Sequence, residues 1–375
     1  MIHILHVIDS LDLGGAQTVI LQIARQMDRS RFSMEVAVMH GRGFFTESLE
    51  KEGIRVHSLS GNKFPPTYIP KFLKLAHGNR FQIFHFHLFG ANWIAKPLAA
   101  LLGHRHLIAH DHCNDLYRSE KPLHIAIDRF TNRFASKIVA VSKSTEDFLT
   151  KVEKIDPSKV TYLANGVDTT RFQPATQEKR SACRQKLGLP QDAIVIGGVG
   201  RLHPQKNFSL FLDVAALLRD QTNVHFVIAG TGPEETMLRR KAVSLGLDKQ
   251  IHFAGLVSDM PDFYAALDGL LLTSRYEGMP ITVLEAMASG LFVVGSDLDG
   301  VKEVISDGVN GYLVNPNSAP DFVSRLNSLI ASTDVRRTVG NAARRHVETH
   351  FAIESMVSTL ERLYLQEMKN DESTV

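Results

Sequence analysis

Two cations follow a glycine-ended apolar run in the second half of the chain. Ile194–Val199 is predicted to be a buried strand, and Arg201 and Lys206 come after it, in a loop that leads into a helix. Ligands of open α/β sheets bind at the carboxyl ends of strands, and cations beside a helix N-terminus attract anions such as a diphosphate. The spacing is not that of a P-loop, and a solvated loop with surface cations explains the pair equally well.

Two carboxylates further along the chain narrow the kind of ligand. Pro280 suits a first helical turn, which places Glu285 in the middle of a helix of otherwise apolar residues. A carboxylate there is costly unless it has hydrogen-bond partners. Glu277 precedes the same helix, where free backbone N–H groups gather. Carboxylates accept well from vicinal hydroxyls, so a sugar or a ribose is the expected ligand. The alternative is an internal ion pair with Arg201 or Lys206.

The first half of the chain offers a glycine pair and a group of histidines. Gly14 and Gly15 follow the first expected strand and open a helix, so the backbone can approach a ligand closely, although a tight turn is the ordinary explanation. Further on, the residue types include enough ligands for a zinc site: His85, His87, His110, Asp111, His112 and Cys113. They come from two different strands and could meet only if those strand ends are neighbours. We therefore expect no metal.

The elements that must position these residues form two series. Short apolar runs alternate with amphipathic segments of helical length along the chain, which is typical of βαβ units and parallel sheets. We expect an N-terminal Rossmann-like domain over residues 1–172, a linker over 173–191 and a C-terminal Rossmann-like domain over 192–350. A single doubly wound sheet is the alternative, but it would need about a dozen strands.

Composition excludes several classes of protein. Of the 375 residues, 44% are hydrophobic and 22% are charged, which indicates a folded globular chain. The formal net charge of +2 argues against a nucleic-acid surface. Two cysteines make no disulfide framework and favour a reducing compartment. The sequence begins without a signal-peptide pattern and lacks an apolar stretch of membrane-spanning length, so we expect a cytoplasmic protein, at most bound to the inner face of a membrane.

At this point the motifs resemble those of a known family. Glu277 and Glu285 with seven residues between them, together with Gly-Arg-Leu-x-x-x-Lys-Asn at 200–207, resemble the retaining glycosyltransferases of family GT4. The likeness continues over 230–233, 254–255, 277–280, 285–290 and 307–314, and over 14–15 and 165–168 in the first half. Asp299-Gly300 and Phe292 depart from it, since two glycines and a proline are common there. The resemblance implies a GT-B architecture, with two facing Rossmann-like domains, an inter-domain cleft and a last helix, 353–370, that crosses back onto the N-terminal domain.

The resemblance also assigns roles to individual residues. Arg201 and Lys206 would hold the diphosphate, Glu277 would bind hydroxyls of the transferred sugar and Glu285 those of the ribose. The other implied donor contacts are mostly main-chain: Gly14 and Gly15, Val257 beside the base, and Gly278, Met279, Pro280 and Ile281 around sugar and phosphate. His110 aligns with a histidine that reaches the sugar near the reaction centre. His87 and Asp111 are acceptor-side candidates, although they are equally well explained as polar residues at loop ends.

The reaction implied is that of a hexosyltransferase-type enzyme. A glycosyl unit would move from a nucleotide-diphosphate sugar, UDP favoured over GDP, to an acceptor hydroxyl of a glycan or a lipid-linked molecule in polysaccharide or glycolipid biosynthesis. No cofactor and no divalent metal would be required. A nucleotide-sugar epimerase of the same fold and a non-catalytic sugar-nucleotide-binding protein are the alternatives. Residues 115–137 mix basic and apolar side chains; we interpret them as an ordinary amphipathic helix, with peripheral membrane association as the alternative.

Overall fold

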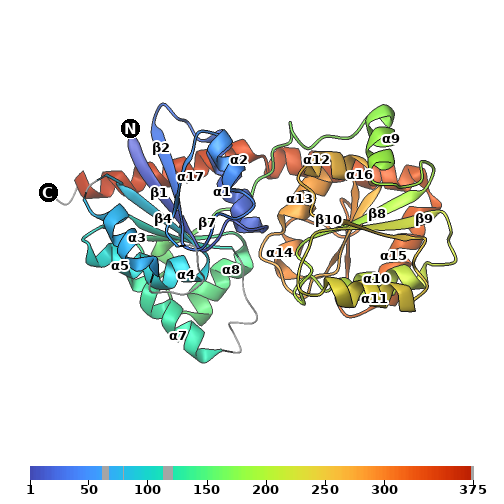
Figure 1. Cartoon of the computed structure of the whole chain (residues 1–375), viewed down its shortest axis with the longest axis horizontal. Helices are drawn as coiled ribbons and strands as arrows, with labels where there is room; N and C mark the ends of the chain where they lie inside the picture. The colour runs from blue at the N-terminus through green and yellow to red at the C-terminus, as the bar shows by residue number, and fades with distance from the viewer. Residues whose placement is uncertain (61–66, 79, 113–120, 373–375) are drawn as a thin grey trace. The chain divides into compact units, whose positions relative to one another are not determined.

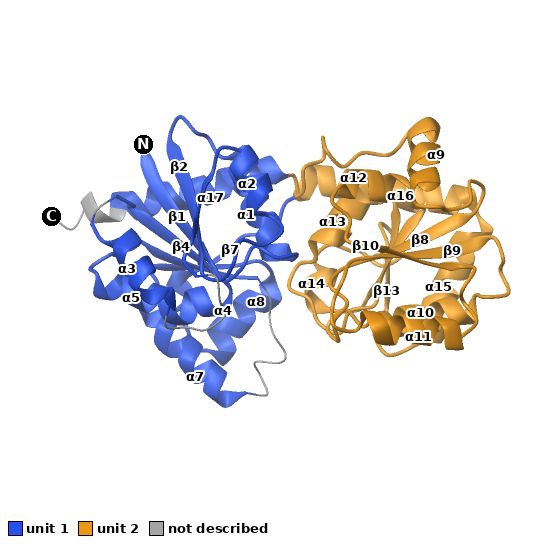
Figure 2. Ribbon diagram, viewed as in Figure 1, with its two compact units in different colours: residues 1–166, 353–375 blue, residues 167–352 orange. Residues whose placement is uncertain are grey.

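The chain folds as two compact units. The computed structural model describes residues 1–60, 67–78, 80–112 and 121–372, with side chains described as far as Lys369. Unit 1 combines Met1–Gly166 with Ile353–Val375, and unit 2 is Val167–Ala352 (Figure 2). Cys113 and the first part of the segment 115–137 lie outside the described residues.

Unit 1 is built on a parallel sheet of seven strands. The order β3-β2-β1-β4-β5-β6-β7 places the first strand near the middle, as in doubly wound folds. The strands are β1 (Ile2–Ile8), β2 (Phe32–Val38), β3 (Arg55–Ser58), β4 (Ile83–His87), β5 (Leu107–Asp111), β6 (Lys137–Ala140) and β7 (Val160–Tyr162). All five residues of β4 are buried, because helices cover both faces of a doubly wound sheet.

The helices of unit 1 include short and irregular ones. They are α1 (Gly15–Gln26), α2 (Thr46–Lys51), α3 (Ile69–Ala76), α4 (Leu88–Gly90), α5 (Lys96–Leu101), α7 (Pro122–Thr131), α8 (Lys143–Asp147) and α17 (Ile353–Glu372), with π-helical turns at Ala91–Ala95 (η2) and Phe148–Val152 (η4) and 3₁₀ turns at Asn132–Phe134 (η3) and Pro157–Lys159 (η5). Ser142 accepts a hydrogen bond from the Thr145 amide and so caps α8.

The last helix belongs to unit 1 although it follows unit 2 in the sequence (Figure 1). The fully buried Tyr364 of α17 packs its ring against Phe32 at the start of β2. The Glu361 side chain accepts from the Asp28 backbone N–H, and Met356 lies against Gly166. The apolar residues that recur at helical spacing on α17 therefore bury themselves on the N-terminal unit.

Unit 2 repeats the pattern with six parallel strands in the order β10-β9-β8-β11-β12-β13. These are β8 (Ile194–Val199), β9 (Val224–Ala229), β10 (Ile251–Gly255), β11 (Gly269–Leu272), β12 (Phe292–Ser296) and β13 (Tyr312–Val314). Its helices are α9 (Gln177–Lys186), α10 (Phe208–Leu217), α11 (Glu235–Ser244), α12 (Met260–Ala265), α13 (Ile281–Ala288), α14 (Asp299–Lys302), α15 (Ala319–Ala331) and α16 (Thr333–His350).

The division of the chain differs in detail from the sequence-based expectation. Unit 1 ends at Gly166 rather than at residue 172, and the expected linker 173–191 contains α9. The guanidinium of Arg184 on this helix is buried and donates to the Ala266 carbonyl and to Asp268 of unit 2. Residues 173–191 are therefore part of unit 2, not a free connection.

None of the helices in the described ranges combines the length and the apolar character that a bilayer crossing requires.

Candidate functional site

The loop that carries Arg201 and Lys206 leaves β8 through glycines. Gly198 lies under α10, where an added Cβ would come within 2.7 Å of the Phe211 ring. Gly200 has φ +154°, a conformation that favours glycine. A Cβ on Gly230 would overlap the Gly200 carbonyl oxygen. The strand end and the loop after β9 therefore approach so closely that side chains are excluded at these positions.

Lys206 and Glu277 meet at the carboxyl ends of β8 and β11. Lys206 Nζ lies 2.5 Å from Glu277 Oε1, and the Ser274 hydroxyl donates to the same oxygen at 2.6 Å. The Glu277 carboxylate is 7% exposed and the Lys206 side chain 19% exposed. The predicted cation and carboxylate therefore share one hydrogen-bonded cluster, which includes Ser274, a residue that the sequence did not single out.

Hydrogen bonds to main-chain carbonyls hold the two loops together. The Thr273 hydroxyl donates to the carbonyls of Lys206 and Asn207 at 3.2 and 3.1 Å. The side-chain amide of Gln205 donates to the Tyr276 carbonyl, and the Arg275 backbone N–H donates back to the Gln205 carbonyl. Asn207 adopts the left-handed conformation, φ +50°, at the start of α10. Lys206 is therefore fixed at both ends, by its backbone and by its ammonium group.

Arg201 differs from Lys206. Its side chain is exposed, and within the described residues it forms no ion pair. The pKa of His203, two residues away, is lowered by burial and by the charge of Arg201. Lys206 is paired with Glu277, so the uncompensated positive charge in this loop is that of the exposed Arg201, for which the described residues supply no carboxylate. This arrangement suits an external anion.

Glu285 lies in the interior of α13 and has a different partner. The hydroxyl of the fully buried Tyr264 donates to Glu285 Oε2 at 3.0 Å. Burial raises the pKa of Glu285 to about 7, against smaller lowering effects of Tyr264 and the charge of Arg171. The alternative of an internal ion pair with the predicted cations holds for Glu277 and Lys206, whereas Glu285 has no hydrogen bond to either cation.

The turn before α13 is closely packed. Gly278, Met279, Pro280 and Ile281 are all buried. A Cβ on Gly300, at the start of α14, would overlap the Gly278 carbonyl oxygen. Gly300 therefore positions the turn that carries Glu277. From the sequence, Gly300 was notable only because Asp299-Gly300 stands where two glycines are common in the family. Val257 lies in the loop after β10 and is half-buried.

In unit 1, the predicted residues lie at the carboxyl ends of the central strands. Gly14 and Gly15 are exposed at the start of α1. His87 and His110 are directly opposite each other on β4 and β5, with ring centroids 5.2 Å apart. Burial lowers the pKa of both well below the usual histidine value, so both rings are neutral. Asp111 follows His110 and is half-buried.

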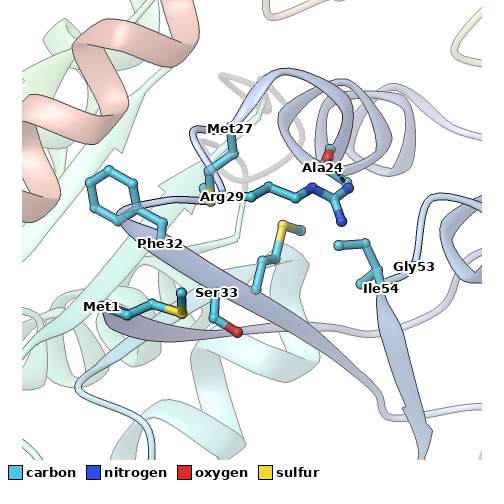
Figure 3. Close-up of a pocket in the computed structure, with 9 residues that line it drawn as sticks. Met1, Ala24, Met27, Arg29, Phe32, Ser33, Gly53 and Ile54 are labelled. Atoms are coloured by element: carbon cyan, nitrogen blue, oxygen red, sulfur yellow. Dashed lines mark hydrogen bonds between the residues drawn. The ribbon is translucent and has the colours of Figure 1, made fainter.

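A small pocket on unit 1 lies away from these residues (Figure 3). It has a volume of about 190 Å³ and is lined by Met1, Ala24, Met27, Arg29, Phe32, Ser33, Met34, Gly53 and Ile54. Phe32 begins β2, and Met1 and Ile54 directly precede β1 and β3. The pocket is thus at the amino-terminal edge of the sheet, opposite to the edge where ligands of open α/β sheets bind.

Two family models match the chain, one in each half. Residues 13–171 match the model described as "Glycosyltransferase Family 4", and residues 179–346 match "Glycosyl transferases group 1". Together they cover the predicted site residues of both units.

Curated relatives are about a quarter to a third identical to the chain over the part that aligns. The UDP-Gal:alpha-D-GlcNAc-diphosphoundecaprenol alpha-1,3-galactosyltransferase of Escherichia coli is 27% identical over 68% of the chain and 66% of its own length. The D-inositol 3-phosphate glycosyltransferase of Salinispora arenicola is 31% identical over 61% of the chain and 54% of its own length. The chain thus spans less than two thirds of these two relatives.

Solved structures resemble the chain over almost its full length. The Anabaena protein Alr3699/HepE, crystallised in complex with UDP and glucose, covers 97% of the chain with a TM-score of 0.88 and 23% identity. Sucrose-phosphate synthase from Thermosynechococcus elongatus covers 98% with a TM-score of 0.82 and 17% identity. These likenesses confirm the expected fold of two Rossmann-like α/β domains.

Proposed function

This chain belongs to the GT4 glycosyltransferases (glycosyl transferases group 1) and has their GT-B fold, and we propose that it transfers a sugar from a nucleotide-diphosphate donor to an acceptor hydroxyl with retained anomeric configuration. The observation that carries the proposal is the cluster of Lys206, Ser274 and Glu277 at the carboxyl edge of the unit 2 sheet, beside the exposed Arg201. In this cluster a cation suited to bind phosphate lies next to a carboxylate suited to bind hydroxyls, and this pairing supports the proposal.

The donor contacts follow from the chemistry of each group. A lysine ammonium has three donors, so Lys206 can keep its bond to Glu277 and still donate to a phosphate oxygen. Tyr264 binds Oε2 of Glu285, and we assign Oε1 to the ribose hydroxyls. Main-chain groups of Gly278, Met279, Pro280 and Ile281 would flank sugar and phosphate, with Pro280 offering only its carbonyl. Val257 would lie beside the base, and Gly14 and Gly15 would contact phosphate.

The mechanism that we propose is a front-face displacement. The bond between the sugar C1 and the phosphate oxygen breaks while the acceptor oxygen bonds to C1 on the same face. The departing phosphate takes the acceptor proton, so no protein nucleophile is needed. Arg201 and Lys206 stabilise the charge of the leaving phosphate, and His110 contacts the sugar. Because fixed cations supply this stabilisation, the transfer step would need no divalent metal.

A UDP-sugar is the donor that we favour over a GDP-sugar. The name of the Escherichia coli relative specifies UDP-Gal, and the similar Anabaena structure was determined with UDP and glucose. On the acceptor side, His87 and Asp111 are the candidates for binding a glycan or lipid-linked hydroxyl. The named relatives that use diphosphoundecaprenol or build a lipopolysaccharide core support this acceptor class. Peripheral association with the cytoplasmic face of a membrane would follow from such an acceptor.

A panel of donors tests the proposal. Purified chain is incubated with UDP- and GDP-sugars, and released nucleotide and changed sugars are both measured. Slow hydrolysis that releases UDP is expected, and Lys206→Ala should abolish it. Formation of an epimer would instead identify an epimerase. Binding of the donor without release, in the presence and absence of candidate acceptors, would contradict transfer.

A further inference from the structure

Five histidine side chains lie on one face of the unit 1 sheet. His6 is directly opposite His85 across β1 and β4, and His87 is directly opposite His110 across β4 and β5. His85 and His87 are two residues apart on β4, and His112 stands two residues after His110. Side chains at i and i+2 of a strand, and at opposed positions of neighbouring strands, share a face. The zinc hypothesis required the ends of β4 and β5 to be neighbours, and they are. Strand β1 adds His6, which was not predicted from the sequence.

The three most deeply buried of these histidines lie close to one another. His6, His85 and His87 are fully buried, and each offers a ring nitrogen within 4.8 Å of the nitrogens of the other two. Their ring centroids are 4.4 to 5.2 Å apart. Tetrahedral zinc with bonds of about 2.0–2.1 Å holds its nitrogen ligands about 3.3 Å apart. The ring planes lie at 17° to 35° to one another, so the rings must rotate to point these nitrogens at one ion.

The remaining ring nitrogens already have partners of the kind that orient metal ligands. His85 Nδ1 lies 2.6 Å from the Tyr364 hydroxyl, which is also 3.5 Å from His6 Nε2. His87 Nδ1 lies 2.9 Å from His112 Nε2. This leaves His85 Nε2 without a partner within the described residues, while His6 Nδ1 and His87 Nε2 face each other at 2.9 Å. One nitrogen of each of the three rings is thus left to bind an ion, and the other nitrogen of each ring lies near a group that orients the ring.

We propose that His6, His85 and His87 bind a divalent transition-metal ion, with Zn²⁺ as the natural occupant, and that Tyr364 and His112 orient the ligands. Imidazole is a ligand that suits zinc, copper and nickel, whereas magnesium and calcium require oxygen. Water or hydroxide would fill the fourth position, as it does in zinc centres with three histidines.

A second triplet, His87, His110 and His112, also brings its ring nitrogens within 4.8 Å of one another. Both nitrogens of His110 lack a hydrogen-bond partner within the described residues, so stacking on the neighbouring rings, and no supporting hydrogen bond, orients this ring. The deeper triplet has the supporting bonds and is the assigned site. The metal would connect β1 with β4 and, through Tyr364, with α17. This inference concerns unit 1 and does not depend on the proposed transfer reaction. It assigns both ring nitrogens of His87, to the ion and to His112, so that Asp111 becomes the acceptor-side candidate.

Metal binding by the full chain tests the assignment. Tag-free protein is stripped with a chelator, dialysed and titrated with Co²⁺ and with Zn²⁺, while visible absorption and retained metal are recorded. We expect about one ion per chain, a tetrahedral Co²⁺ spectrum that Zn²⁺ abolishes, and a higher melting temperature with Zn²⁺. No retained ion, or only an octahedral Co²⁺ spectrum, would overturn the proposal.

Variants locate the ion. His85→Gln and His6→Gln should lose the spectrum, whereas His225→Gln should keep it. His225 pairs with His252 in unit 2 and is the matched control. Tyr364→Phe retains all three ligands and should bind one ion about 10 to 100 times more weakly. This conservative change keeps the test decisive if a histidine variant fails to fold. Loss of binding in His110→Gln but not in His85→Gln would place the ion in the other triplet and contradict the assignment.

Discussion

Glu277 and Glu285 are both buried, but different groups stabilise their charges. An ammonium and a hydroxyl hold Glu277, so its negative charge is compensated inside unit 2. The Glu285 carboxylate accepts a hydrogen bond from the phenol hydroxyl of Tyr264, and burial outweighs that bond in setting the pKa of Glu285. A carboxylate held at a cost in stability is typical of a site that evolved for binding. Replacing Glu285 with a neutral residue should therefore raise the stability of the protein and lower its affinity for the donor.

Glu285→Gln should stabilise the protein in a pH-dependent way. The pKa is raised from 4.5 to about 7 on folding, so below pH 4.5 both states are protonated and Glu285 costs nothing. As the pH rises through about 7, the wild type loses up to roughly 3 kcal/mol relative to a neutral side chain. Melting temperatures measured between about pH 5 and pH 8 should therefore diverge in favour of the variant, while its donor affinity falls.

The half-exposed Glu235 of the same unit supplies the control, and Glu235→Gln should show no such divergence. A difference between Glu285→Gln and wild type that is constant over the pH range would contradict the assigned burial cost.

Residue types and spacing were enough to predict Arg201, Lys206, Glu277 and Glu285 as site candidates. They could not predict Ser274 or Tyr264, because a serine in a loop and a tyrosine on an amphipathic helix have ordinary structural explanations. Their roles depend on which side chain they meet in space, as when Tyr264 of α12 reaches Glu285 of α13. The histidines were noticed, but their convergence depended on strand order, which periodicity does not encode.

At the scale of elements, glycines allow the loops of unit 2 to approach one another. Gly300→Ala introduces a methyl group that overlaps the Gly278 carbonyl, so α14 or the turn before α13 must move. A misplacement of about 1 Å costs on the order of 100-fold in catalysis. We expect such a loss of turnover with little change in circular dichroism. Asp299→Ala, next to it and exposed, should retain activity; equal activity of both variants would show that the contact does not position the site.

Helix α7 buries polar side chains and exposes large apolar ones. It buries Asp128 and Thr131 but leaves Leu123 69% and Phe130 56% exposed. The buried Asp128 accepts from the Trp93 indole at 2.5 Å. An ordinary amphipathic helix, which the sequence favoured, would bury its large apolar residues instead. This pattern supports the proposed membrane association.

Sedimentation with anionic vesicles tests α7. Leu123→Glu with Phe130→Glu should reduce the bound fraction several-fold, since two apolar anchors are replaced by charges of the lipid's sign. Val243→Glu changes an equally exposed apolar residue of α11 in unit 2 and should bind like wild type. Unchanged binding of the double variant would exclude α7 as the contact.

Sequence patterns predicted most of the strands but not every helix. In α9, Cys183 and Arg184 are the buried residues, so its polar sequence was interpreted as a linker. The buried face of α17 was visible in the sequence, but the surface that it covers was implied only by the family resemblance. The periodicity of a terminal helix shows which of its faces is buried, but not which distant part of the chain it packs against.

At the scale of the whole molecule, unit 1 depends on a segment that follows unit 2 in the chain. Met356, Leu360, Leu363 and Tyr364 of α17 are buried there. At about 1.5–3 kcal/mol each, their burial is comparable with the roughly 5–15 kcal/mol of a whole domain. Truncation after Ala352 should therefore unfold unit 1 and leave unit 2 folded.

Differential scanning calorimetry measures this directly. The full chain should show contributions from two cooperative units, and the truncated chain should retain one. A chain ending at Lys369 serves as the control and should melt like the full chain. Loss of both transitions after truncation at Ala352 would mean that unit 2 does not fold independently.

The central claim is that the carboxyl edge of the unit 2 sheet binds the diphosphate of a sugar nucleotide through Lys206. Calorimetric titration of UDP, without added divalent cation, tests it most directly. Wild type should bind, and Lys206→Ala should bind about 10 to 100 times more weakly, because a charge-assisted hydrogen bond contributes about 1.5–3 kcal/mol. Lys241→Ala, which removes an ion-paired lysine elsewhere in unit 2, should bind like wild type. Equal UDP affinity of Lys206→Ala and wild type would contradict the account.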